Sequence, residues 1–195
     1  MELDTIGIDL GKTVFRLVGL NRAGEVVVRR KFSRLQLLRF TANLRVRLIG
    51  MESCGGSHFL GRALREQGHE VRLMPAQYVK PYMKINKDDY IDAEAIVEAV
   101  WRANMRFVPI KSSEQLDMQS LHRVRDRWAA RRTSVINQIR GLLLERGITF
   151  RKGRRHAEAS LPAVPEDADN GLSGLLRMLL TSVAGRTETV AEPDR

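Results

Sequence analysis

The sequence predicts a mixed α/β fold, a sheet with flanking helices, followed by a long helix of the coiled-coil type. Three observations lead to this expectation: strand-like segments fill the N-terminal part, strands and helices then alternate, and residues 111–147 keep a helical pattern without proline. A chain of 195 residues is long enough for one full domain and an appendage.

The N-terminal part predicts an antiparallel meander. Residues 3–10, 13–20 and 24–32 are rich in β-branched and apolar side chains, and in the second segment charged residues alternate with apolar ones. The "NRAG" sequence between the second and third segments is typical of a tight turn. Three strands with short connections follow from these signals.

Crossover elements come next. Residues 33–44 predict a helix, because leucines recur at helical spacing behind a capping serine. Residues 45–53 predict a strand, residues 57–67 a helix that Gly68 ends, and residues 69–75 another strand before the next helix opens. An antiparallel edge continued by crossover strands and helices is typical of a ribonuclease H-like layered fold.

The long helix has its own start and stop signals. Ser112 and Gln115 fit a capping box, and Gly147 fits a C-terminal stop. Apolar residues follow a heptad pattern along it, with Arg131 in one place of the stripe. The stripe consists of Leu121, Val124, Trp128, Val135, Ile139 and Leu142. Because one helix cannot bury such a stripe alone, we expect an antiparallel partner helix or a second chain.

These signals divide the chain into three predicted parts. Residues 1–110 form the α/β domain and residues 111–148 the helical arm. Residues 149–195 mix proline, glycine and charge, and predict a linker, a short helix and a disordered tail.

The composition favours a nucleic-acid partner in the cytoplasm. The formal net charge is +10, and polyphosphate is the commonest partner of so basic a surface. The single cysteine, Cys54, cannot form an internal disulfide, which fits a reducing cytosol, and we expect it to be buried near a turn. No apolar run approaches the roughly 18 residues of a membrane span, so we expect neither a span nor an export signal.

Four carboxylates occur where the predicted fold brings elements together. Asp9 and Glu52 each end an apolar strand, and these strands are neighbours in a ribonuclease H-like sheet. Asp89 and Asp92 lie three positions apart where the next helix opens, so both can face one point. Four carboxylates in one cleft repel one another unless cations neutralise them, and hard oxygen ligands suit Mg²⁺ or Mn²⁺. We therefore expect a pair of divalent ions that activates an attacking hydroxyl and stabilises the leaving oxygen of a phosphodiester.

Each acid also has an ordinary structural explanation. Asp9 fits a turn former, and Glu52 fits the partner of an arginine. Asp88, Asp89 and Asp92 fit the positive end of the next helix, where acids act as caps and dipole partners without catalysis. The catalytic hypothesis is preferred because these explanations would have to coincide in the order that a nuclease needs.

Four segments resemble a known family. The stretches "IGIDLGK", "GMESCGG", "HEVRLMPAQYVKPYMK" and "NKDDYIDAEAI" are similar to the N-terminal nuclease domain of the DEDD insertion-sequence transposases, which include the pilin-gene inverting recombinase Piv and the bridge-RNA-guided recombinases. The family pattern, a strand aspartate, G-M-E and K-T-D-x-x-D-A, falls on Asp9, Glu52, Asp89 and Asp92. Asp88 stands where the family has threonine, which leaves it as an alternative to Asp89.

The resemblance covers about residues 4–148 and has further implications. It implies a RuvC-like fold, two bound Mg²⁺ or Mn²⁺ ions, DNA as the substrate and homo-oligomers formed through the helical arm, and it leaves open a structured guide RNA as a partner. It also implies a C-terminal domain with a nucleophilic serine, for which residues 149–195 offer no counterpart. We therefore expect a truncated copy or natural fragment, for which strand exchange by the chain alone is doubtful.

Basic residues supply a predicted surface for the nucleic acid. Arginine forks bind phosphates in a bidentate manner, and lysines ahead of the acidic helix are placed to hold a backbone near the metals. The predicted contacts are Lys12, Lys84, Lys87, Arg123, Arg127, Arg131, Arg132, Arg154 and Arg155. The alternative for the arginines of the long helix is an ordinary solvated face.

The sequence thus predicts a DNA transposase or recombinase with divalent-metal-dependent strand cleavage and transfer. Two other classes stay open. One is a nucleic-acid-binding fragment without turnover. The other is an actin-like small-molecule kinase, because "GIDLGKT" resembles the first phosphate loop of that superfamily; it would need a second glycine-rich strand and a larger second domain, which the sequence does not supply.

Overall fold

The computed structural model describes residues 3–82 and 90–145, together with residues 147, 149, 151–153, 156, 174 and 178. The chain divides into two compact units, Met1–Gln115 and Leu116–Arg195. The first unit contains all five strands.

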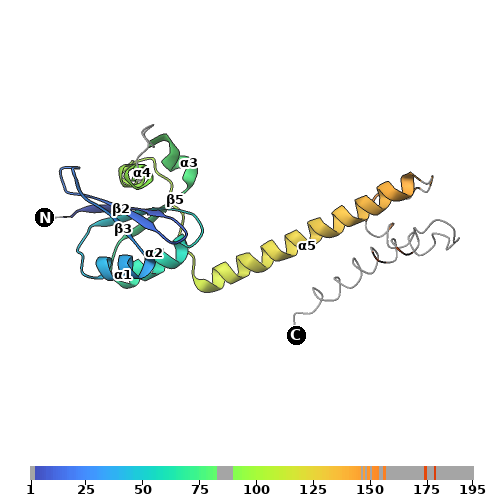
Figure 1. The fold of residues 1–195 in the computed structure, drawn as a ribbon, viewed down its shortest axis with the longest axis horizontal. Coiled ribbons are helices and arrows are strands. Elements are labelled where there is room, and N and C mark those ends of the chain that lie inside the picture. The colour runs from blue at the N-terminus through green and yellow to red at the C-terminus, as the bar shows by residue number, and fades with distance from the viewer. Residues whose placement is uncertain are drawn as a thin grey trace. The chain divides into compact units, whose positions relative to one another are not determined.

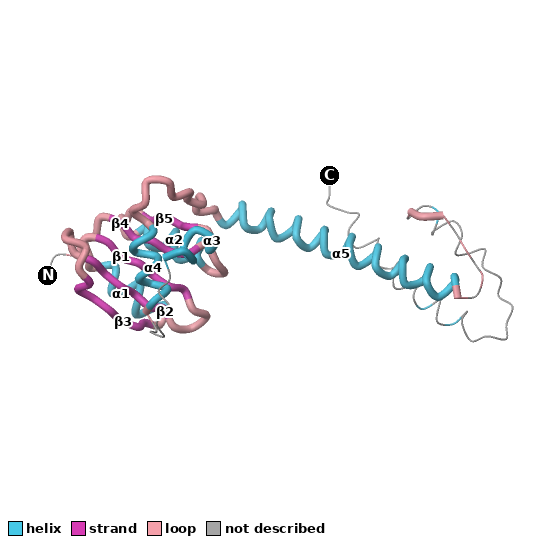
Figure 2. Tube along the Cα trace, turned by 90° about the horizontal axis from the view of Figure 1, so that it is seen from above, coloured by secondary structure: helices cyan, strands magenta, loops and turns pink. Residues whose placement is uncertain are grey.

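The sheet has the order β3-β2-β1-β4-β5, which Figure 2 shows from above. Its strands are β1 (Thr5–Leu10), β2 (Phe15–Leu20), β3 (Val26–Phe32), β4 (Leu48–Glu52) and β5 (Val71–Met74). The first three strands pair in antiparallel fashion, whereas β4 and β5 run parallel to β1. This mixed sheet with its flanking helices fits the ribonuclease H-like fold that the sequence predicts.

The turn between β2 and β3 follows from its residues. The side-chain oxygen of Asn21 accepts hydrogen bonds from the backbone N–H groups of Ala23 (3.0 Å) and Glu25 (2.9 Å). Gly24 has a φ of 83°, a left-handed conformation that glycine adopts without a steric penalty. The predicted "NRAG" turn is therefore confirmed.

Helices cover both faces of the sheet (Figure 1). On one face lie α1 (Arg34–Ala42) and α2 (Ser57–Glu66), which complete the larger core. This core includes Ile6, Ile8, Leu17, Leu37, Ile49, Met51, Leu60, Leu64 and Leu73, all at most 1% exposed. On the other face, α3 (Ala76–Val79) and a short 3₁₀ helix, η1 (Lys80–Tyr82), precede α4 (Ile91–Ala99).

Two glycines let α4 lie directly on the sheet. A Cβ atom on Gly7 of β1 would overlap the carbonyl oxygen of Ala93 and would lie 2.8 Å from Cβ of Val97. A Cβ atom on Gly50 of β4 would lie 3.1 Å from Cβ of Val100. The two glycines are direct partners in the parallel β1–β4 register. Helix α4 therefore packs directly on the backbone of β1 and β4, and neither glycine position has room for a side chain.

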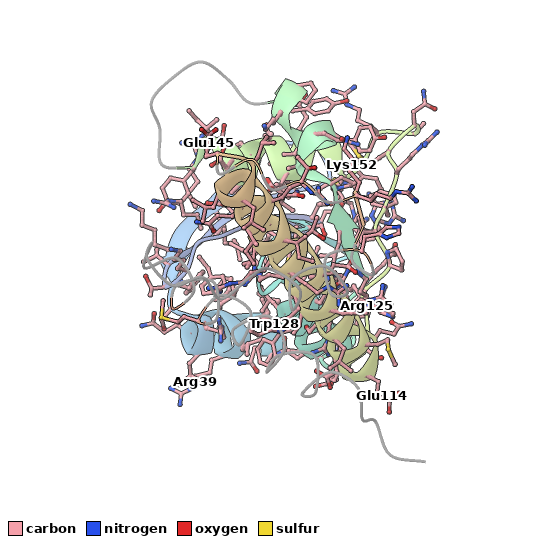
Figure 3. All side chains as sticks on the ribbon, turned by 90° about the vertical axis from the view of Figure 1, so that its right-hand side faces the viewer. Arg39, Glu114, Arg125, Trp128, Glu145 and Lys152 are labelled. Carbon is pink, nitrogen blue, oxygen red and sulfur yellow. The ribbon has the colours of Figure 1, made fainter. Side chains whose placement is uncertain are left out.

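The long helix α5 (Ser113–Leu144) begins as predicted. Ser112 N–H donates to Gln115 Oε1 (3.0 Å) and Gln115 N–H donates to Ser112 Oγ (3.1 Å), which is the predicted capping box. Figure 3 labels Glu114 in its first turn and Trp128 further along. The pairing of α5 in a coiled coil stays a prediction.

The apolar stripe of α5 differs in exposure along the helix. Leu121, Val124 and Trp128 are 65%, 52% and 40% exposed, whereas Ile139 is fully buried. The first half of the stripe therefore presents large apolar side chains at the surface of the second unit.

Within the described part of the chain, no helix combines the length and the apolar character that crossing a bilayer requires.

Candidate active site

Asp9 and Glu52 lie side by side on the face that α4 covers. Side chains alternate between the two faces of a strand, so Asp9 shares its face with Gly7, and Glu52 shares its face with Gly50. Gly7 and Gly50, on which α4 packs, are partners in the parallel register. Asp9 and Glu52 each lie two residues after one of these glycines, so they lie next to one another in neighbouring strands. The predicted meeting of these carboxylates at one edge of the sheet is thus found in the backbone arrangement.

Asp92 comes to the same place from the helix. It lies in the first turn of α4, directly before Ala93, the residue whose carbonyl oxygen contacts Gly7. The N-cap position is occupied by Tyr90, which makes no side-chain cap bond. The close packing of α4 on β1 therefore holds Asp92 near Asp9, while its position in the first turn also suits the helix dipole.

The three carboxylates act on one another electrostatically. Burial, followed by the charge of Asp92, raises the pKa of Asp9, while Arg16 acts in the opposite direction. Burial, followed by the charges of Asp9 and Asp92, raises the pKa of Glu52, against the effect of Lys80. Crowded acids whose ionised forms disfavour one another form an electrostatic site for cations.

Two basic side chains border this acidic group. Arg16 Nη1 lies 3.5 Å from Asp9 Oδ2, and the charge of Lys80 in η1 lowers the pKa of Glu52. Lys80 precedes the predicted pair Lys84 and Lys87, whereas Arg16 is a residue that sequence reasoning missed. Its signal was the hairpin register, in which Arg16 pairs directly with Asp9.

The donor set fits a hard divalent cation in chemistry, because all its members are carboxylates. Among the residues that the structure describes, no three His, Cys, Asp or Glu side chains are grouped as a formed metal site. Asp89, the fourth predicted ligand, and its alternative Asp88 lie outside the described residues. Asp9, Glu52 and Asp92 thus interact electrostatically, but the described residues do not surround a metal position on their own.

Cys54 corrects one expectation. It is exposed, in the turn that follows β4, and not buried. Strand β4 ends at Glu52, so Cys54 lies two residues past its end. Partial desolvation of the thiol, followed by the charges of Glu52 and Asp9, raises the pKa of Cys54, which keeps it protonated and a poor nucleophile.

The predicted nucleic-acid contacts fall in three groups. Lys12 is exposed in the turn between β1 and β2, three positions after Asp9. On α5, Arg123, Arg127 and Arg131 are exposed and Arg132 is partly buried. The remaining predicted contacts, Lys84, Lys87, Arg154 and Arg155, lie outside the described residues.

Comparisons with known proteins agree with this arrangement. A family model described as "Transposase" (DEDD_Tnp_IS110) matches residues 6–147. The "Probable family 20 transposase" of Pseudomonas aeruginosa is 44% identical over 191 residues, which are 97% of this chain and 56% of the relative. The "Transposase for insertion sequence element IS1111A" of Coxiella burnetii is 38% identical over 195 residues, 98% of this chain and 54% of the relative.

One solved structure adds a weak likeness. "T. thermophilus RuvC in complex with Holliday junction substrate" has a TM-score of 0.41 and 12% identity, covering 55% of this chain and 100% of that one. The chain spans about half the length of the curated relatives it matches. The family match covers the elements that carry Asp9, Glu52 and Asp92, and the chain belongs to the IS110-type DEDD transposase family.

Proposed function

We propose that residues 1–110 form the nuclease domain of a DNA transposase that cleaves and joins DNA strands with the help of divalent cations. The observation that supports this most is the gathering of Asp9, Glu52 and Asp92 beside Gly7 and Gly50, where α4 packs on the sheet. There the charge of Asp92 helps to raise the pKa of Asp9, and the charges of Asp9 and Asp92 help to raise that of Glu52. A structural role alone gives no reason to place three acids in mutual repulsion. Family membership also favours this function over the actin-like kinase.

Asp9, Glu52 and Asp92, with the predicted Asp89, would hold Mg²⁺ or Mn²⁺, and we propose two ions. Such ions polarise a phosphate and stabilise the attacking and leaving oxygens of a phosphodiester. The fold supports this proposal by bringing the acids together. Asp9 and Glu52 lie in the neighbouring strands β1 and β4, and Asp92 lies in the first turn of α4, which packs on them. Because the two strand acids sit on backbone within the sheet, their separation is set before any ligand binds.

We propose DNA as the partner of the exposed basic residues. Arg123, Arg127 and Arg131 lie on α5, and arginine binds phosphate in a bidentate manner. Lys12 lies in the turn between β1 and β2, next to the acidic site, where it would contact a phosphate close to the metals. A structured RNA offers the same phosphates, so competition between duplex DNA and a folded RNA for the purified chain would decide which is preferred.

Nicking of supercoiled DNA tests the proposal. We expect the purified chain to nick DNA in Mg²⁺ or Mn²⁺, and Asp9→Asn or Asp92→Asn to lower the rate at least about 100-fold, because each removes a metal ligand. The matched control is Glu98→Gln on the same helix, whose carboxylate is 3.0 Å from Arg102 at an exposed site; it should nick like the wild type.

The outcome also separates the proposal from its alternative. DNA binding in chelator without metal-stimulated nicking would favour a nucleic-acid-binding fragment without turnover. Because the chain spans about half of its relatives, the substitutions should be repeated in a full-length relative, where a serine-bearing second half is predicted. Recombination by a relative that lacks the counterparts of both Asp9 and Asp92 would refute the catalytic assignment.

A further inference from the structure

Arg16 is joined to Asp9 by the architecture of the hairpin. The two residues are direct partners in the antiparallel β1–β2 register, so their side chains leave the same face a short distance apart. Arg16 Nη1 lies 3.5 Å from Asp9 Oδ2, and the side chains are 29% and 23% exposed. This ion pair is therefore more sheltered than a typical surface pair.

The surroundings direct the guanidinium toward Asp9. Lys31 of β3 is the direct partner of Arg16 on its other side, so a like charge stands opposite the acid. The Lys31 ammonium lies 5.7 Å from the centre of the Tyr90 ring, just before α4. In the sheet register, Arg16 thus lies between a like charge on β3 and the opposite charge of Asp9 on β1.

The contact has a consequence for any cation that binds there. A carboxylate whose Oδ2 already faces a guanidinium has one of its oxygens engaged, and a divalent ion at the same group would experience the positive charge of Arg16 at close range. Arg16 therefore already supplies positive charge at the carboxylate where a metal ion would bind.

We propose that Arg16 is an internal counter-ion that competes with divalent cations for Asp9, and so sets the concentration at which the acidic site fills. This inference rests on the proposed function, since it takes Asp9 as a ligand. Arg16 is a positioning residue that acts through Asp9. Its role is to keep the acids neutralised in part until a divalent ion displaces it.

Binding of Mn²⁺ alone to the full chain, measured by calorimetry or by the loss of the free-ion spin-resonance signal, tests the proposal. At about pH 8, where carboxylates are ionised, Arg16→Gln should lower the Mn²⁺ dissociation constant roughly three- to tenfold, as expected for one partly sheltered charge. Arg16→Lys keeps the charge and should bind Mn²⁺ like the wild type. The matched control is Arg29→Gln on β3, which removes an equal charge from the ion pair with Glu94, an acid outside the predicted ligand set.

A double-mutant cycle gives the decisive comparison. If Arg16 acts through Asp9, the gain from Arg16→Gln disappears in the Asp9→Asn background. Equal effects of Arg16→Gln and Arg29→Gln would overturn the proposal, because they would report net charge alone. Tight Mn²⁺ binding that needs Asp9 but ignores Arg16 would overturn this inference and leave the proposed function intact, whereas binding that ignores Asp9 would overturn both.

Discussion

At the scale of the residue, Glu52 shows how a site acid weakens the fold that carries it. Burial and the charges of Asp9 and Asp92 raise its pKa above the ordinary value of 4.5. The folded protein thus holds this proton more tightly than the unfolded chain does. The resulting stabilisation is present below the ordinary pKa and is lost as the pH rises through the raised pKa of the folded state.

Replacing this carboxyl should therefore stabilise the protein. In metal-free buffer at about pH 7, Glu52→Gln should raise the melting temperature by roughly 2 °C, because glutamine has no charge to repel Asp9 and Asp92. Calorimetry at about pH 4 should show a smaller difference, because the wild-type carboxyl is then protonated. Glu98→Gln, at an exposed ion pair, is the control. A lower melting temperature for Glu52→Gln near neutrality would contradict the assigned electrostatics.

The sequence alone does not distinguish the structural role of Asp4 from the site position of Asp9. Asp4 is 9% exposed, and its Oδ2 accepts hydrogen bonds from Thr5 Oγ1 (3.0 Å) and Arg47 Nη2 (3.0 Å). The Arg47 guanidinium also lies 4.1 Å from the centre of the Trp101 ring. Both aspartates belong to the first strand segment, yet Asp4 anchors a structural network and Asp9 faces other acids. The distinction depends on distant partners, which local pattern does not reveal.

At the scale of the element, the packing of α4 on β1 decides where Asp92 lies. A Cβ atom on Gly7 would overlap the Ala93 carbonyl, so Gly7→Ala forces the helix or the strand to shift. We expect a loss of unfolding free energy on the order of 3 kcal/mol, measured by denaturant titration, as for an overpacked core. Gly55→Ala is the matched control, because its Cβ would have nothing within 4 Å.

The same substitution links packing to the site. A displaced α4 moves Asp92 away from Asp9, so Gly7→Ala should also weaken Mn²⁺ binding at temperatures where the variant remains folded. Unchanged stability together with unchanged Mn²⁺ binding would show that the position of α4 does not require glycine at position 7.

Helix α5 carries an exposed apolar stripe whose partner is still a prediction. Leu121, Val124 and Trp128 present large side chains in heptad positions. If a second copy covers them, Leu121→Glu with Val124→Glu should shift the chain from dimer or tetramer to monomer in light scattering after gel filtration, because two charges would be buried. Arg123→Gln with Arg127→Gln, on the same helix but off the stripe, lowers the net charge by the same amount and is the control. A wild-type monomer would exclude a second copy as the partner.

At the scale of the whole molecule, the net charge of +10 favours the proposed association with nucleic acid. Each phosphate contact releases a counterion, so affinity falls steeply with salt. Arg131→Gln with Arg132→Gln should reduce the slope of log K against log salt by about 2 in fluorescence anisotropy with duplex DNA. Arg39→Gln with Arg65→Gln removes the same charge from α1 and α2, and should leave the slope nearly unchanged. Equal changes for both pairs would indicate that no defined arm surface is used.

Much of the fold of the first unit followed from local signals in the sequence. Turn residues, capping serines and apolar alternation indicated the order of strands and helices, and this order placed Asp9 beside Glu52. Arg16 was missed because its contact depends on hairpin register. The exposure of Cys54 was missed because it depends on whether other parts of the fold cover this turn, which the local sequence does not show. The packing of α4 on Gly7 and Gly50 was also missed, although β1 and β4 share the pattern Ile-Gly-apolar-acid at residues 6–9 and 49–52.

That shared pattern has a consequence for how this chain tolerates change. Neither Gly7 nor Gly50 offers an atom to a ligand, yet even a methyl group at position 7 would collide with a neighbouring backbone. Replacing Asp9 by glutamate keeps a carboxylate. Every replacement of Gly7 adds a Cβ atom to the space that the backbone of α4 occupies. In a saturation library selected for function, the two glycines should be as intolerant of variation as the acids they accompany.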